Sequence, residues 1–254
     1  MPFHPFLDHP RPLAFAHRGG AAGGLENTMT AFARAVAAGY RYVETDVHAT
    51  ADGTLVAFHD RTLDRVTDRT GRIAALPIRD VRAARIGTDE RIPLFDELLG
   101  TWPELRVNID IKTEAAIGPL VRAVRRHGAL DRVCVGSFSG SRLAKVRAAL
   151  GPGLATSMGP RDVARLRLAS LTGGRPRFGA GVCAAQVPVR HKALRIVDKR
   201  FIVTAHRVGL QVHVWTIDDP AVMSHLLDLG VDGIMTDRID VLRDVLTARG
   251  SWAA

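Results

Sequence analysis

The chain has 254 residues, of which 46% are apolar and 24% charged, and 35 lysines and arginines against 26 aspartates and glutamates give it a formal net charge of +9. This composition excludes a disordered or collagen-like chain, and the length allows a large core that needs no disulfide or structural metal. No run reaches the ~18 consecutive apolar residues of a membrane span, so we expect no stable membrane insertion.

The two cysteines, Cys134 and Cys183, lie inside apolar runs. We expect buried thiols in a reducing compartment rather than a disulfide. Residues 1–12 lack the basic start and apolar stretch of a secretory signal, so the sequence predicts a cytoplasmic protein.

The positive net charge favours an anionic partner. However, it is carried by arginines scattered along expected helices, such as Arg165 and Arg167, which indicates solvated helix faces and argues against nucleic acid.

Short apolar runs alternate with amphipathic stretches along the whole chain. We expect nine strands, at residues 13–17, 42–48, 55–59, 106–112, 132–138, 154–158, 182–187, 211–217 and 233–236. The clearest helical patterns cover residues 28–38, 115–127, 141–150, 199–208, 220–229 and 239–248, and each is closed by a glycine. The stretch 71–99 is the least regular and is the best candidate for a loop over the active-site mouth.

The second and third strands differ from the others because only a turn centred on Asp52 and Gly53 separates them. Parallel neighbours need a crossover of a dozen or more residues, so these two strands should form an antiparallel hairpin. If Asp52 and Gly53 are the two loop residues, residue 51 pairs with residue 54, and His59 lies opposite Asp46.

Setting the return strand of the hairpin aside leaves eight units of a strand followed by a helix. The sequence therefore predicts an α/β protein with a single domain over residues 1–254, a (β/α)8 TIM barrel with a short hairpin after its second strand at the C-terminal face. A doubly wound open sheet is the alternative. In a barrel of this kind the active site lies at the C-terminal ends of the strands.

Polar side chains share one face of two expected strands. In 42–48 they are Glu44, Asp46 and His48, and in 106–112 they are Asn108, Asp110 and Lys112. Either these faces lie in water or, in a barrel, they point inward and bring three carboxylates to one mouth. At about 5 Å and an effective dielectric near 20, each like-charged pair costs roughly 3 kcal/mol. A divalent cation would remove that cost, and an all-oxygen donor set points to Mg²⁺, Ca²⁺ or Mn²⁺.

Two histidines are expected at the same mouth. His17 ends the first strand, and the hairpin brings His59 close to the carboxylates. Two histidines beside a metal suit acid–base chemistry, and Arg18 and Lys112 supply the positive charge that a phosphoryl group requires. The sequence therefore predicts a small anionic phosphoester as substrate. The glycines of 19–24 lack the Lys-Ser/Thr of a nucleotide-binding loop, so ATP chemistry is not expected.

Taken together, the motifs resemble those of the glycerophosphodiester phosphodiesterase family. They occur in the family's order over nearly the whole chain: His17-Arg18-Gly19, Glu26-Asn27-Thr28, Glu44-Thr45-Asp46-Val47, Asp52-Gly53, His59-Asp60, Leu63 to Arg65 with Thr67, Asp110 with Lys112, His213 with Trp215-Thr216, and Asp232-Gly233-Ile234-Met235-Thr236-Asp237.

The resemblance implies a TIM-barrel enzyme that uses Mg²⁺ or Ca²⁺, or else Mn²⁺, to hydrolyse glycerophosphodiesters such as glycerophosphocholine and glycerophosphoethanolamine to sn-glycerol 3-phosphate and an alcohol. By position it implies the following roles: His17 and His59 as the acid–base pair; Glu44, Asp46 and Asp110 as metal ligands; Arg18 and Lys112 as phosphate contacts; Glu26 as a support at the metal or glycerol end; and Trp215 as an apolar wall. The family usually has glutamate where this chain has Asp110.

Three questions stay open at this point. The base would deprotonate either water or the substrate's own glycerol 2-hydroxyl, the latter giving a cyclic phosphate. The resemblance extends more weakly to phospholipase D-type enzymes acting on lysophospholipids or sphingomyelin, and an exposed apolar rim at the mouth would favour such a lipid. A barrel that only binds an anion, without catalysis, is the alternative from another functional class.

Overall fold

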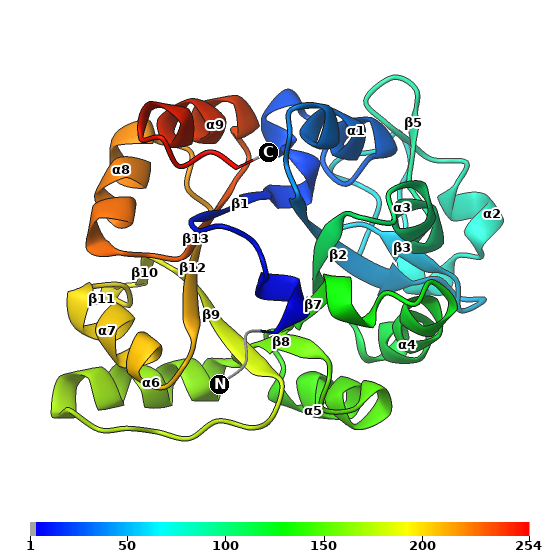
Figure 1. The fold of residues 1–254 in the computed structure, drawn as a ribbon. Coiled ribbons are helices and arrows are strands. Elements are labelled where there is room, and N and C mark those ends of the chain that lie inside the picture. The colour runs from blue at the N-terminus through cyan, green and yellow to red at the C-terminus, as the bar shows by residue number, and fades with distance from the viewer. Residues whose placement is uncertain (1–3, 254) are drawn as a thin grey trace.

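The computed structural model describes residues 4–253, so the first three residues and the last of the predicted domain lie outside the described part. Within it, eight parallel strands form a closed barrel (Figure 1). Their spatial order is β1-β13-β12-β9-β8-β7-β6-β2, and β1 pairs with β2 to close the ring. The TIM barrel prediction is confirmed, and the open sheet is wrong. The strands are β1 Leu13–Ala16, β2 Tyr42–Ala49, β6 Arg106–Ile111, β7 Val133–Gly136, β8 Ala155–Ser157, β9 Val182–Pro188, β12 Gln211–Trp215 and β13 Gly233–Thr236, and β3 Leu55–Ala57 extends the sheet beside β2.

An outer ring of helices surrounds the barrel (Figure 1). It consists of α1 Met29–Ala37, α3 Phe95–Thr101, α4 Ile117–Arg126, α5 Gly140–Leu150, α6 Pro160–Thr172, α7 Lys199–Arg207, α8 Pro220–Leu229 and α9 Ile239–Ala248. The ring packs on the outward apolar side chains of the strands, such as Val43, Val47 and Ile109, in one continuous core. None of the helices in residues 4–253 is both long and apolar enough to cross a membrane.

Two expectations about the helical layer need correction. The stretch 71–99 is not loop throughout, because α3 begins at Phe95 inside it, where the side chain of Glu97 accepts a hydrogen bond from the backbone N–H of Leu94 at 2.9 Å. Arg167 of α6 does not lie on a solvated face. Its side chain is 13% exposed and forms an ion pair with Asp198 at 2.8 Å.

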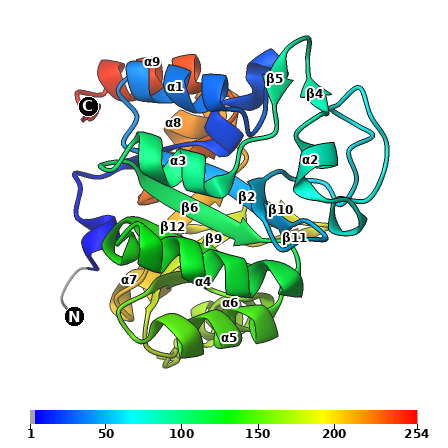
Figure 2. The ribbon, with the colours of Figure 1, turned by 90° about the vertical axis from the view of Figure 1, so that its right-hand side faces the viewer.

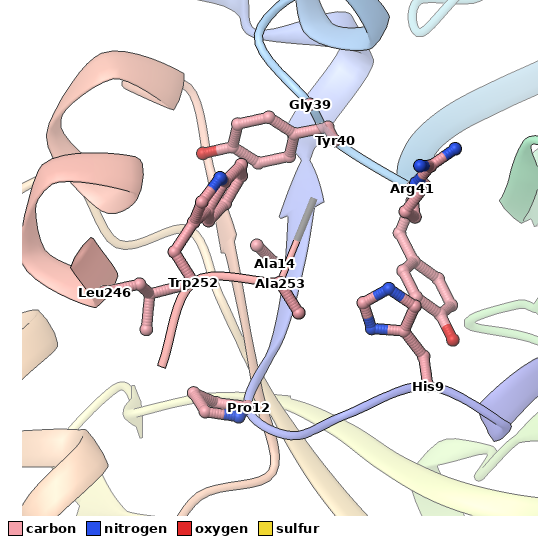
Figure 3. Close-up of a pocket in the computed structure, with 10 residues that line it drawn as sticks. His9, Pro12, Ala14, Gly39, Tyr40, Arg41, Leu246, Trp252 and Ala253 are labelled. Carbon is pink, nitrogen blue, oxygen red and sulfur yellow. The ribbon is translucent and has the colours of Figure 1, made fainter. Parts of the chain in front are cut away.

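The N-terminal end of the barrel is closed by the chain itself. The short helical turn η1 (Pro5–Leu7) inserts Phe6, fully buried, against the inward-facing Phe15 and Tyr42, and the Tyr42 hydroxyl donates to the Phe6 carbonyl at 2.7 Å. A small hollow beside this end is walled by Tyr40 and Trp252 (Figure 3). Its volume of about 10 Å³ holds no more than a water molecule, so the substrate site must lie elsewhere.

The hairpin forms as predicted, but its register differs by one residue. Its loop contains three residues, 51–53, and the last of them has a φ of +76°, a common geometry for a three-residue hairpin loop. Asp46 therefore faces Phe58, whose backbone N–H donates to the Asp46 carbonyl at 2.9 Å. The predicted pairing of His59 with Asp46 is wrong.

Two additional segments lie on the side toward which β2 and β6 point (Figure 2). One follows the hairpin and contains α2 (Ile78–Val81) and the strand pair β4 (Arg85–Ile86) and β5 (Glu90–Arg91). It has an apolar cluster of its own around Phe58 and is thus packed rather than an open loop. The other is the strand pair β10 (Arg190–His191) and β11 (Leu194–Arg195). Both place the C-terminal ends of the strands at the bottom of a walled hollow.

Candidate active site

A cavity of about 770 Å³ opens at the C-terminal ends of the strands. Eight of the nine predicted site residues line it, and only Glu26 stands behind them, beside Arg18. The period of two places Glu44 and Asp46 of β2 and Asn108 and Asp110 of β6 inside the barrel as expected, whereas His48 does not line the cavity. The residues that line the cavity are His17, Arg18, Glu44, Asp46, His59, Asp110, Lys112 and Trp215.

His17 follows β1 and is held from behind by a carboxylate. Its Nδ1 lies 2.7 Å from Asp237 Oδ1, and its Nε2 lies 3.7 Å from Glu44 Oε2 inside the cavity. Burial lowers the pKa of His17, but the charge of Glu44 and the hydrogen bond to Asp237 outweigh it, so the net pKa is raised. With Nδ1 occupied by Asp237, Nε2 is the nitrogen free to exchange a proton in the cavity.

His59 has a matching arrangement. Its Nδ1 lies 2.6 Å from Asp60 Oδ1, while Arg65 donates to the other Asp60 oxygen at 2.5 Å. Burial raises the pKa of Asp60, but the hydrogen bonds from Arg65 and His59 outweigh it and lower the pKa to about 2. His48, which the strand period placed with the acidic face, lies behind this group with its Nε2 3.1 Å from the His59 carbonyl oxygen. It does not line the cavity.

Arg65 also connects the two histidine sides of the site. Its guanidinium donates to both carboxylate oxygens of Glu26, at 2.6 and 2.9 Å, and Arg18 donates to the same carboxylate at 3.1 Å. Burial raises the pKa of Glu26, but these cations outweigh it and the net pKa is lowered. Glu26 is thus a charged support between Arg18 and Arg65. Its role at the metal or glycerol end stays a prediction.

The carboxylates at the centre are bridged by the chain's own cation. Lys112 Nζ lies 2.8 Å from Asp46 Oδ1 and 2.7 Å from Asp110 Oδ2. Burial raises the pKa of Asp46, but Lys112 and Arg18 outweigh it and the net pKa is lowered. Lys112 therefore offsets part of the repulsion between the carboxylates, which we had expected a metal ion to remove.

The negative charges of Glu44 and Asp110 are less well compensated by neighbouring cations than that of Asp46. Burial, followed by the negative charge of Asp46, raises the pKa of Glu44, and burial raises the pKa of Asp110. Asp110 Oδ1 is buried, and no residue of 4–253 offers it a hydrogen bond. In that same range no three His, Cys, Asp or Glu groups are arranged as a ready-made metal site. The donor chemistry nevertheless fits a hard divalent cation, because hard carboxylate oxygens converge here and Asp110 Oδ1 lacks a partner.

The backbone after β1 is shaped to present Arg18. This residue has a φ of +51°, which is uncommon for residues other than glycine. Backbone conformations of this kind concentrate at functional sites. In this turn the backbone N–H of Arg18 donates to Glu44 Oε2 at 3.2 Å. The side-chain Nε of Arg18 lies 3.4 Å from Asp46 Oδ2. Asn27, fully buried, donates to Asp46 Oδ2 at 3.2 Å. Asp46 is therefore fixed from three sides, by Arg18, Asn27 and Lys112.

The chain is similar to one family of known enzymes. Residues 17–241 match the sequence model of the glycerophosphoryl diester phosphodiesterase family. The chain belongs to this family. It is a phosphoric diester hydrolase, 42% identical over 251 residues to the probable glycerophosphodiester phosphodiesterase 2 of Mycobacterium tuberculosis, covering 97% of this chain and 95% of that protein. It is 28% identical over 269 residues to a glycerophosphodiester phosphodiesterase of Caldanaerobacter subterraneus, covering 94% of this chain and 100% of that protein.

A solved structure is also similar to this enzyme. The phosphodiesterase of Oleispira antarctica, solved in complex with the product sn-glycerol-3-phosphate, superposes with a TM-score of 0.79 at 22% identity, covering 93% of this chain and 97% of that one. At that identity the likeness supports the barrel fold.

The sequence did not assign roles to the residues that orient the histidines. The family motifs include all three of these residues: Asp60, Arg65 and Asp237. Their positions in the sequence did not show that they contact the histidines. Asp237 lies 220 residues from His17 and meets it only because β1 and β13 are neighbours in the barrel. One signal could have identified Asp237: it is a carboxylate just beyond the end of a strand, and that strand is the barrel neighbour of the strand that ends at His17.

Proposed function

We propose that this enzyme hydrolyses glycerophosphodiesters, such as glycerophosphocholine and glycerophosphoethanolamine, to sn-glycerol 3-phosphate and an alcohol, with a divalent cation. The observation that carries the proposal is the pair of histidines, each with Nδ1 against a carboxylate, in one cavity with the Glu44, Asp46 and Lys112 cluster. A binding protein needs no oriented proton donor and acceptor, so the pair supports catalysis over an inactive anion-binding barrel.

The chemistry follows from the atoms that each side chain leaves free. One histidine Nε2 takes the proton of the attacking oxygen, which belongs either to water or to the substrate's own glycerol 2-hydroxyl, and the other gives a proton to the leaving alkoxide. In the second case a water molecule then opens the cyclic phosphate to give sn-glycerol 3-phosphate. A P–O bond to the incoming oxygen forms while the P–O bond to the alcohol breaks. Arg18 and Lys112 lie on the cavity wall, where their charges stabilise the phosphoryl oxygens as negative charge builds up.

Glu44, Asp46 and Asp110 would hold the divalent cation, with Mg²⁺ or Ca²⁺ expected first and Mn²⁺ as a further candidate. When bound, such a cation supplies additional positive charge to the phosphoryl group and neutralises the acidic cluster. It would compete with Lys112 for the oxygens of Asp46 and Asp110. The shorter side chain of Asp110, in place of the family's usual glutamate, is expected to affect which metal binds best.

We also propose a cytoplasmic location, which the two free, buried thiols of Cys134 and Cys183 support. A small phosphodiester suits the cavity better than a nucleic acid does, because the polar groups converge inside the barrel.

The test is an add-back experiment. Protein stripped with a chelator and then supplied with Mg²⁺, Ca²⁺ or Mn²⁺ should release glycerol 3-phosphate from glycerophosphocholine or glycerophosphoethanolamine. His17→Ala, folded by circular dichroism, should lose about 10²- to 10⁴-fold in rate. Activity that survives complete chelation would contradict the role of the metal, and full activity in His17→Ala would contradict the proposed site.

A further inference from the structure

The exposed apolar side chains of the molecule gather at the mouth of the active-site cavity. Within residues 4–253, five large apolar side chains are exposed. Four of them line this cavity, each more than half exposed, and we call them the apolar rim: Phe138, Leu168, Leu171 and Leu194. The fifth, Val222, lies on α8 and is not among the lining residues. Large apolar side chains held in water at one place mark a binding surface rather than chance exposure.

The apolar rim comes from three separate segments of the chain. Phe138 follows β7 and packs edge-on against Trp215, with ring centroids 5.9 Å apart. Leu168 and Leu171 lie three residues apart on one face of α6. Leu194 belongs to β11. Because these segments border one opening, the rim is part of a broad face of the molecule rather than a narrow groove.

The same part of the chain carries most of the net positive charge. The 36 residues 160–195, from α6 to β11, contain eight lysines and arginines but only one aspartate. Their net charge is +7 out of +9 for the whole chain, so the other 218 residues carry only +2. Two of the eight cations have carboxylate partners, Arg165 with Asp162 at 3.4 Å and Arg167 with Asp198 at 2.8 Å. The charge is thus concentrated in the stretch that supplies three members of the apolar rim.

The β10–β11 hairpin lies on the side toward which β2 and β6 point and carries exposed cations (Figure 2). Arg190, Lys192 and Arg195 are exposed, and none of them takes part in an ion pair within residues 4–253. Arg190 and Arg195 face each other across the two strands, and like charges at directly opposite positions destabilise a sheet. Lys192 has a φ of +52° in the turn, where glycine would be relaxed. An anionic surface would relieve the repulsion that this hairpin carries in water.

We propose that this face docks on the surface of an anionic lipid bilayer. The apolar rim enters the boundary between head groups and acyl chains, while Arg190, Lys192 and Arg195 contact the lipid phosphates. Stable peripheral binding needs apolar side chains and basic ones together, because either signal alone holds a protein only weakly at the interface. The proposal concerns binding of the protein to a membrane and does not depend on which phosphodiester the enzyme cleaves.

A second copy of this chain and a nucleic acid fit the face less well. A symmetric dimer through the apolar rim would bring two stretches of charge +7 together, and their repulsion opposes that contact. A nucleic acid would pair with the arginines but leave the exposed leucines without an apolar partner. An anionic bilayer matches both properties, since it has negative charge at its surface and hydrocarbon directly beneath it.

Binding to vesicles tests the proposal without any substrate turnover. The protein is sedimented with vesicles of phosphatidylcholine alone, or of phosphatidylcholine with about 30% phosphatidylglycerol, which gives the surface its negative potential. We expect binding to the anionic vesicles to be tighter by roughly tenfold or more, and to weaken as salt is raised from about 0.1 M to about 0.5 M. No binding to the anionic vesicles, or equal binding to both kinds, would overturn the proposal.

A cation variant tests the role of the hairpin. It combines Arg190→Gln, Lys192→Gln and Arg195→Gln. Each cation near an anionic membrane strengthens binding by roughly fivefold, so this variant should bind the anionic vesicles about 100-fold more weakly. The matched control removes three exposed arginines from other elements: Arg41→Gln, Arg122→Gln and Arg207→Gln. The control should lose less than about fivefold. Equal losses in the two variants would show attraction by net charge alone and would overturn the docking face.

An apolar variant tests the role of the rim. It combines Leu168→Ser, Leu171→Ser and Leu194→Ser. Because these side chains are exposed, thermal unfolding should be unchanged, whereas binding to the anionic vesicles should weaken at least about tenfold. Val222→Ser, at an exposed helix position away from the cavity, should bind as the unmodified protein does. Unweakened binding by the apolar variant would overturn the proposal. A dimer in sedimentation velocity that this variant dissociates would assign the face to a second copy and overturn it as well.

Discussion

Asp237 is the residue whose substitution most sharply tests how the site works. Its carboxylate holds His17 Nδ1 at 2.7 Å and is 29% exposed. Asp237→Asn keeps the size of the side chain and removes its charge. A hydrogen bond to a charged group contributes about 1.5–3 kcal/mol, and partial exposure places this one at about 1.5–2 kcal/mol. Expressed as a rate, that is a loss of about 10- to 30-fold in kcat/KM.

The variant should also change the pH dependence. Because Asp237 and Glu44 raise the pKa of His17, removing the charge of Asp237 should lower that pKa. The limb of the pH–rate profile that reports His17 should therefore move to lower pH, whether His17 serves as acid or as base. The assay is choline release from glycerophosphocholine across pH 5–9, with thermal unfolding as the folding control.

Two results would refute this reasoning. A kcat/KM within twofold of the unmodified enzyme, with an unshifted pH profile, would show that Asp237 does not position His17. A loss as large as that of His17→Ala would show that Asp237 does more than position the imidazole. Asp60→Asn on the His59 side is the matched comparison, because the contact there has nearly the same length, 2.6 Å.

Three further predictions concern stability and metal binding. Phe6→Ala removes the buried ring that closes the barrel and should lower the free energy of unfolding by about 3–5 kcal/mol in urea titration; a loss below about 1 kcal/mol would contradict its role as the barrel floor. Asp60→Asn should cost about 1 kcal/mol of stability at pH 7, allowing for solvent screening. Because the folded-state pKa of Asp60 is lowered to about 2, that difference should be complete above the unfolded pKa and should shrink as pH falls from 5 to 3; a constant difference would contradict the ion pair. Lys112→Met should tighten Mg²⁺ or Mn²⁺ binding to chelator-treated protein by about tenfold in calorimetry, since Lys112 occupies the same oxygens; unchanged or weaker binding would argue against the competition.

The barrel itself could be predicted from the sequence because its signals are local. Each strand is a short apolar run, and the period of two fixed which side chains of β2 and β6 face inward. The hairpin register was wrong because it depends on one residue of loop length, which Asp52-Gly53 alone does not determine. The helix α3 was missed because it has only seven residues and follows a long irregular segment.

The site could be predicted only in part, for a different physical reason. Glu44 and Asp46 of β2 and Asp110 of β6 were placed correctly because backbone geometry determines their direction, whereas His48 at the end of β2 does not line the cavity. The bridge that Lys112 forms between Asp46 and Asp110 depends on a side-chain conformation, which no sequence pattern specifies. Trp215 was expected as an apolar wall, but the sequence did not show that Phe138 and Leu168 line the same cavity, because they come from separate segments that only the closed barrel brings together.

The most direct test of the central claim is to identify the phosphorus-containing product. Phosphorus NMR of metal-supplied enzyme with glycerophosphocholine should show one product, sn-glycerol 3-phosphate, formed at a rate that falls at least 100-fold in both His17→Ala and His59→Ala. Formation of phosphocholine instead, or product formation unaffected by either substitution, would contradict the account of which bond breaks and which residues break it.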